Sequence, residues 1–139
     1  MKVNLEDSID LGITMDALAL GAISTDDVSA WASRVIDVMD DPPTYIYTML
    51  DLQGLYGKDL QREIGFVAGA DLDDAEFQYL REIGVRRGLE QFEYLAGKKP
   101  VTLNAMRKAR LDELLRRNFG IDPDALPPLS DFRAERSSH

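Results

Sequence analysis

The chain has 139 residues, a net charge of −9 and no cysteine. The length favours a single domain, and the lack of cysteine excludes disulfides, thiolate metal ligands and a cysteine nucleophile. The only histidine is His139, at the last position, which disfavours mechanisms that depend on a positioned imidazole. No apolar run approaches the ~20 residues of a membrane span, and the opening residues lack a secretory signal, so we expect a cytoplasmic protein.

The charge is unevenly distributed along the chain. Residues 1–79 hold 16 acidic and 4 basic residues, whereas residues 80–139 hold 9 acidic and 12 basic residues. Phosphate backbones and anionic lipid surfaces repel such a molecule, so we expect neither nucleic-acid nor membrane binding. The same charge steers the chain toward a basic partner. The alternative interpretation is that the negative charge only keeps the protein soluble.

Apolar residues recur with a helical period, and capping residues, glycines and prolines separate the periodic segments. We expect helices over residues 14–21, 24–39, 42–53, 58–68, 74–96 and 102–118. This pattern predicts an all-α fold, a single compact domain of about six helices over residues 13–120. The polar residues 1–12 predict an N-terminal arm, with at most a brief strand at Val3–Leu5. The proline-containing residues 121–139 predict a partly ordered C-terminal tail.

Several helix starts carry recognisable caps. Ser24 and Asp27 have the spacing of a capping box, with aspartate in the place of glutamate. Thr14 and Thr102 are expected to cap the first and last helices. Asp41 is expected to cap a helix whose first turn contains two prolines, where a missing N–H costs little.

The helix interiors give further expectations. Trp31 and Val38 share the apolar stripe of the second helix, and Met106 belongs to that of the last, so we expect all three to be buried. Gly84 and Gly88 lie inside the longest expected helix, where each costs about 1 kcal/mol relative to alanine. Either close approach of a neighbouring helix or a kink or break near Gly84 explains them.

One acidic segment, residues 71–82, has a superficial likeness to a calcium loop. It has Ala75 at the fifth position, where a ligand oxygen is needed, and Glu76 at the sixth, where a glycine is needed. We therefore interpret these acids as residues that favour the positive end of a helix dipole.

A second acidic group is flanked by tyrosines. The candidate partner-binding residues are Asp37, Asp40, Asp41, Tyr45, Tyr47 and Asp51. Tyrosines of this kind are enriched at protein interfaces. Solvated helix ends, a partner contact, and acid–base or metal chemistry are the three interpretations of the group.

Basic residues are concentrated in the C-terminal half, at Arg86, Arg87, Lys98, Lys99, Arg107, Lys108, Arg110, Arg116 and Arg117. Acidic residues alternate with them at helical spacing, for example Glu82 with Arg86 and Asp112 with Arg116. We expect these charges to form ion pairs on helix surfaces. The serines and threonines have no evident base beside them, so no catalytic residue is assigned.

Residues 15–52 read MDALALGAISTDDVSAWASRVIDVMDDPPTYIYTMLDL. The short helix ending in glycine, the GAISTDDV turn and the proline-started helix resemble the front part of small helical bacterial immunity proteins of toxin systems, including contact-dependent growth inhibition. The resemblance implies a non-catalytic protein that binds and neutralises a cognate toxin domain, with no cofactor and no metal. A basic toxin that attacks nucleic acids fits the acidic charge.

Two other function classes stay open. One is an acidic helical adaptor or regulatory module that binds a different protein. The other is a carboxylate-based, metal-dependent hydrolase, which a metal would stabilise against unfolding. The sequence leaves the contacting face and the oligomeric state open.

Overall fold

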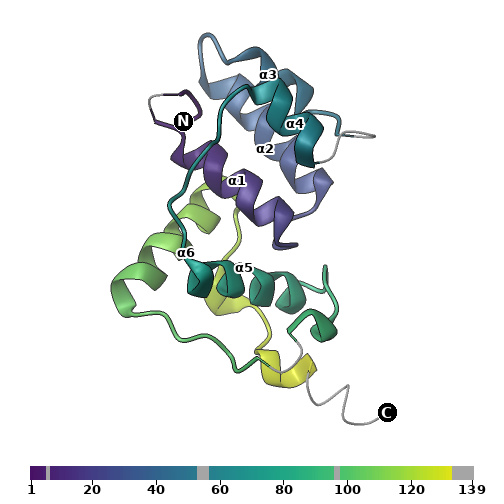
Figure 1. Ribbon diagram of the computed structural model, residues 1–139, viewed down its shortest axis with the longest axis vertical. Helices are drawn as coiled ribbons and strands as arrows, with labels where there is room; N and C mark the ends of the chain where they lie inside the picture. The colour runs from purple at the N-terminus through teal and green to yellow at the C-terminus, as the bar shows by residue number, and fades with distance from the viewer. Residues whose placement is uncertain (6, 53–56, 96–97, 133–139) are drawn as a thin grey trace. The chain divides into compact units, whose positions relative to one another are not determined.

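A computed structural model describes residues 1–5, 7–52, 57–95 and 98–132 of the chain. Figure 1 shows that the regular elements of this part are helices. The β-structure of the described residues consists of one isolated antiparallel bridge between Asn4 and Asp7. The predicted all-α fold is therefore confirmed. The last predicted tail residues, 133–139, lie outside the described residues.

The chain forms two compact units. Unit 1 consists of Met1–Ala19 and Ser24–Asp71, and unit 2 consists of Leu20–Ile23 and Leu72–His139. The helices of unit 1 are α1 (Ile9–Ala19), α2 (Thr25–Val38), α3 (Thr44–Thr48) and α4 (Gly57–Ile64). Those of unit 2 are α5 (Asp74–Arg86), the 3₁₀ helix η1 (Phe92–Leu95), α6 (Ala105–Phe119), the 3₁₀ helix η2 (Pro123–Ala125) and a last helical stretch over residues 129–132.

The second helix, α2, begins as predicted. The Ser24 N–H donates to Asp27 Oδ2 at 2.8 Å, and the Asp27 N–H donates to Ser24 Oγ at 3.2 Å, which completes the capping box.

Trp31 is fully buried, as expected. Val38 is 67% exposed, so its expected burial is wrong. Val38 is the last residue of α2, where the apolar stripe no longer faces a neighbour.

The first helix, α1, begins at Ile9, so the predicted cap at Thr14 is wrong. Thr14 lies inside the helix, where its buried hydroxyl donates to the Asp10 carbonyl at 2.8 Å. In the first turn, the buried Asp10 carboxylate accepts a hydrogen bond from the Lys2 N–H at 2.8 Å, which joins the helix start to the N-terminal residues. A long-range hydrogen bond of this kind leaves no signal in the local sequence.

The third helix is shorter than predicted, and Asp41 does not cap it. It covers Thr44–Thr48, and its N-cap position is Pro43, which makes no side-chain capping bond. Because a proline disfavours helical backbone at the preceding residue, Pro43 keeps Pro42 out of the helix. The fourth helix also ends earlier than predicted, at Ile64.

The fifth helix ends at Arg86 instead of continuing to residue 96. Gly88 has a φ of +76°, a left-handed conformation that glycine adopts without strain and that ends the helix. Gly84 has a different role, because a Cβ built there would lie 2.3 Å from the carbonyl oxygen of Gly21. Close approach therefore explains Gly84, although the neighbour is the backbone turn at Gly21 and not a helix.

The sixth helix has its cap at Asn104, not at the predicted Thr102. Asn104 Oδ1 accepts from the Arg107 N–H at 2.9 Å. The helix stops before Gly120, as predicted. Met106 is 82% exposed, so its expected burial is wrong, because it lies in the first turn on the outer face.

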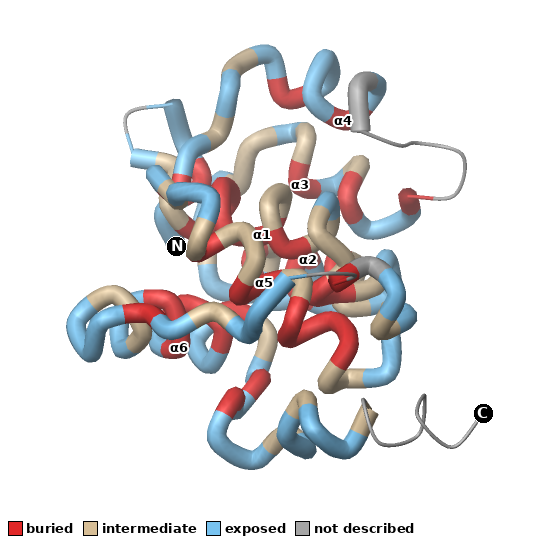
Figure 2. Tube along the Cα trace, turned by 60° about the horizontal axis from the view of Figure 1, so that its bottom comes forward, coloured by how far each residue is buried: buried red, intermediate tan, exposed pale blue. Residues whose placement is uncertain are grey.

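The interior of unit 1 brings α1 close to the segment that follows α4. Figure 2 shows buried positions along the helices, and Ile13 and Ala17 on α1 are fully buried. A Cβ added to Gly12 would lie 2.5 Å from the carbonyl carbon of Gly69 and 2.6 Å from the Ala70 nitrogen. Only a glycine at position 12 permits this separation, and it sets how far α1 lies from residues 66–70.

We expect Gly12→Ala to destabilise unit 1 by about 2 kcal/mol, because the added methyl meets backbone that cannot rotate away. The measurement is urea unfolding followed by the fluorescence of Trp31, the single tryptophan. Gly69→Ala is the control, because a Cβ there meets nothing within 4 Å. Equal stability of the two variants would show that the close approach is not needed.

Candidate functional site

The six candidate partner-binding residues all belong to unit 1. Asp37 is on α2, Asp40 and Asp41 lie between α2 and α3, Tyr45 and Tyr47 are on α3, and Asp51 follows it. The four aspartates are exposed, and Tyr47 is 51% exposed. These five side chains are accessible to a partner.

Tyr45 differs from the others because it is part of the packing of unit 1. Its hydroxyl donates to the Val3 carbonyl, and its ring meets Phe66 edge to face with centroids 6.0 Å apart. Burial raises the pKa of the Tyr45 hydroxyl. Tyr45 therefore joins α3 to the N-terminal residues and to the segment after α4.

The four aspartates do not form one compact cluster. Ser29 Oγ donates to the Leu50 carbonyl at 2.6 Å, so Asp51 lies beside the first half of α2. Asp37 is about 12 Å further along the helix at 1.5 Å per residue, with Asp40 and Asp41 beyond it. We call this row of exposed acids the α2–α3 edge. Within the described part of the chain, no group of three or more acidic or histidine residues is arranged to hold a metal ion.

The net charge of the protein lies entirely in unit 1. Unit 1 contains 13 acidic and 4 basic residues, whereas unit 2 contains 12 of each. Unit 1 thus has a formal charge of −9 and unit 2 is neutral. The sequence halves only approximate this division, because residues 72–79 belong to unit 2.

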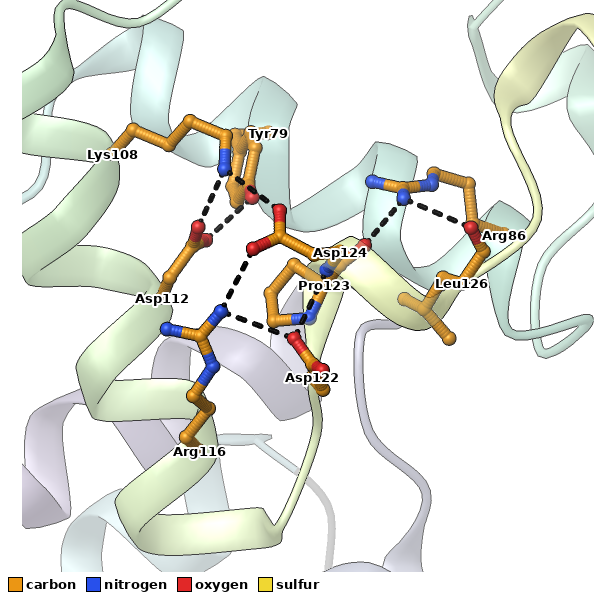
Figure 3. A network of polar contacts seen from close by, with 9 residues as sticks. All are labelled: Tyr79, Arg86, Lys108, Asp112, Arg116, Asp122, Pro123, Asp124 and Leu126. Carbon is orange, nitrogen blue, oxygen red and sulfur yellow. Dashed lines mark hydrogen bonds and ion pairs between the residues drawn. The ribbon is translucent and has the colours of Figure 1, made fainter.

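Several basic residues of unit 2 are held by internal carboxylates (Figure 3). Lys108 Nζ lies 2.7 Å from Asp112 Oδ2 and 3.4 Å from Asp124 Oδ1. Arg116 contacts Asp122 and Asp124 at 3.0 and 3.1 Å. Asp112 thus forms its ion pair with Lys108, one turn earlier, instead of the predicted Arg116.

The same network joins α5 to α6. Tyr79 Oη donates to Asp112 Oδ1 at 2.5 Å, and burial together with this hydrogen bond raises the pKa of Tyr79. The Arg86 guanidinium donates to the carbonyls of Pro123, Leu126 and Pro127. The predicted pairing with Glu82 is replaced by these carbonyl contacts. Burial raises the pKa of Glu82, and the Arg86 charge only partly opposes that rise. The side chains of Arg86, Lys108 and Arg116 thus bind acceptors within unit 2 and stabilise it.

Unit 1 also contains a pocket of about 570 Å³ that the sequence did not indicate. Its lining consists of Met15, Asp16, Leu18 and Ala19 on α1, Thr25 on α2, Leu60, Gln61 and Ile64 on α4, and Phe66, Val67 and Ala68 beyond it. The size lies within the range of small-molecule sites in proteins. The feature of the sequence that could have indicated this pocket is Asp16, a single acidic residue inside the apolar run LGITMDALAL.

Asp16 is the only ionisable residue among the described residues that line this pocket. Burial raises the pKa of its carboxyl from 3.8 to about 6, with no charged group among the causes. Within the described ranges, no hydrogen bond or ion pair involves the Asp16 side chain. The pocket therefore combines apolar walls with one carboxylate that lacks a counterion there.

Comparison with protein-family models, with curated proteins and with solved structures gave no match. In addition, none of the helices in the described ranges has the length and apolar character that crossing a membrane requires.

We expect Asp16→Asn to stabilise unit 1 at pH 7. The folded protein holds the Asp16 proton more tightly than the unfolded chain, so stability falls as the pH rises from 3.8 to about 6. A full shift of this size is worth about 3 kcal/mol, and solvent around the half-exposed carboxylate reduces it to about 1 kcal/mol.

The measurement is urea unfolding of both proteins at pH 7 and pH 4, followed by Trp31 fluorescence. The stability difference should nearly vanish at pH 4. Asp59→Asn, at an exposed position on α4, controls for the loss of one negative charge. A difference that is the same at both pH values would contradict the raised pKa of Asp16.

Proposed function

We propose that this chain is a non-catalytic immunity protein that binds and neutralises a basic bacterial toxin domain, and that unit 1 makes the contact. The observation that supports this function is the separation of charge: unit 1 has a formal charge of −9, whereas the formal charge of unit 2 is zero. An acidic face accelerates association with a basic partner and disfavours partners of the wrong charge. An inhibitor of this kind needs shape and charge but no catalytic group.

The α2–α3 edge is the part of unit 1 that suits this contact. Asp37, Asp40 and Asp41 are exposed at the end of α2, and Tyr47 is half-exposed nearby in the chain on α3. Tyrosine contributes contact area at a low cost in conformational entropy. The row of exposed acids extends over about 12 Å from the level of Asp51 to Asp37 and continues to Asp40 and Asp41. A row of this length matches an extended basic surface better than it matches a single cation.

The test uses the toxin domain encoded beside the gene for this chain. We expect a nanomolar complex that weakens as salt is added, because the attraction between exposed charges is screened. Replacing Asp37, Asp40 and Asp41 together by asparagine should lower the association rate about tenfold at low salt. Surface plasmon resonance at several salt concentrations measures both effects.

The matched control removes three exposed carboxylates from unit 2, at Asp74, Glu113 and Asp131. This variant has the same net charge as the first, and its association rate should change much less. Equal losses for both variants would show that only the total charge matters. If the toxin domain does not bind, while a partner that is not a toxin binds through the same acids, the adaptor interpretation replaces the proposal.

A further inference from the structure

We propose that the pocket of unit 1 is a binding site for a small organic monocation, an ammonium group carried on a hydrocarbon or aromatic body. This site is separate from the α2–α3 edge, and the inference does not depend on the proposed immunity function. The argument rests on the lining of the pocket, on the position of Asp16 and on the charge of unit 1.

The lining favours an apolar body for the ligand. Eight of its eleven residues are apolar, and apart from Asp16 the only polar side chains are those of Thr25 and Gln61. Leu60 and Ile64 form part of the wall and are nearly fully buried, at 1% and 6% exposure. A hydrocarbon chain or an aromatic ring that displaces water from this surface gains free energy in proportion to the area it covers.

Asp16 favours a ligand that carries one positive charge at the end of its apolar part. Its carboxylate is half-buried in the middle of α1, and no described residue supplies a counterion. The other described charged residues of these elements, among them Asp10, Asp26, Asp59 and Arg62, do not line the pocket. An ammonium group next to Asp16 would form a charge-assisted hydrogen bond where water is partly excluded.

The surrounding charge acts in the same direction. Unit 1 has a formal charge of −9, which raises the local concentration of cations and repels anions. A ligand of the same shape with a carboxylate head group would be repelled by the Asp16 carboxylate and by the negative charge of unit 1. The pocket is therefore expected to distinguish ligands of equal shape by their charge.

The test compares three eight-carbon probes, n-octylammonium, 1-octanol and octanoate, by isothermal titration calorimetry on the full chain at pH 7.5. We expect octylammonium to bind at least about tenfold more tightly than octanol, because its head group bonds to a charged acceptor. Octanoate should bind more weakly than either. Equal affinities for the amine and the alcohol, or no binding of the amine, would overturn the proposal.

Asp16→Asn should lower the affinity for octylammonium to that for octanol and leave the affinity for octanol unchanged. Asp59→Asn makes the same change in net charge at an exposed position of α4, and it should preserve the preference for the amine. If both variants lose the preference equally, the amine senses only the general charge of the protein, and the proposed role of Asp16 is wrong.

A second pair of variants tests the location of the ligand. Ala19 is an exposed residue that lines the pocket, so Ala19→Trp should obstruct the pocket and abolish binding of both the amine and the alcohol. Ala30 is exposed on α2 and does not line the pocket, so Ala30→Trp should leave both affinities intact. Circular dichroism verifies that each variant is folded. Binding that survives Ala19→Trp would place the ligand elsewhere.

Proton linkage gives an independent readout. The Asp16 carboxyl, followed by NMR, should titrate near 6 in the free protein and at a lower pH when octylammonium is bound. The pKa should stay unchanged with octanol, because a neutral head group does not favour the carboxylate. An Asp16 pKa that does not respond to octylammonium would contradict a contact between the two.

Discussion

Unit 1 depends on the close approach of two backbone segments, α1 at Gly12 and the chain at Gly69 and Ala70. These segments are far apart in the sequence, and their separation leaves no room for a side chain at position 12. Residues 66–68, which directly precede this contact in the chain, line the pocket together with Asp16 and Ala19 of α1. The close approach at Gly12 thus holds α1 next to a chain segment that lines the pocket, and the one carboxylate of the lining, Asp16, lies one turn further along that helix.

The separation of charge imposes a cost on unit 1 that unit 2 does not have. A formal charge of −9 on a small unit favours unfolding through self-repulsion. The apolar core around Trp31 offsets this repulsion. Unit 2 pairs several of its carboxylates with its own cations, as in the network of Lys108, Asp112 and Arg116. Exposed carboxylates of unit 1 such as Asp37, Asp40 and Asp41 are accessible to an external positive charge.

Some local interactions were predicted correctly from the sequence, whereas the caps at Asp41 and Thr102 were not, and contacts between separate segments left no local signal. The capping box at Ser24 and Asp27 and the burial of Trp31 depend on residues within one or two helical turns, and both were predicted correctly. The early start of α1 is accompanied by the bond between Lys2 and Asp10, and the role of Gly84 depends on the turn at Gly21. The exposed aspartates were recognisable as candidates from composition alone. The pocket around Asp16 was not, because its walls come from three separate segments of the chain, residues 15–19, residue 25 and residues 60–68.

The two proposed activities of unit 1 use the same chemical group in different dielectric surroundings. The aspartates of the α2–α3 edge are exposed, so their attraction extends over about 10 Å and is screened at physiological salt. The Asp16 carboxylate is half-buried among apolar side chains, so its interaction is short-range and much less sensitive to salt. The exposed aspartates suit the long-range attraction of a large basic partner. Asp16 suits the selection of a small ligand by direct contact, and because the two effects respond differently to salt, they are separable within one folded unit.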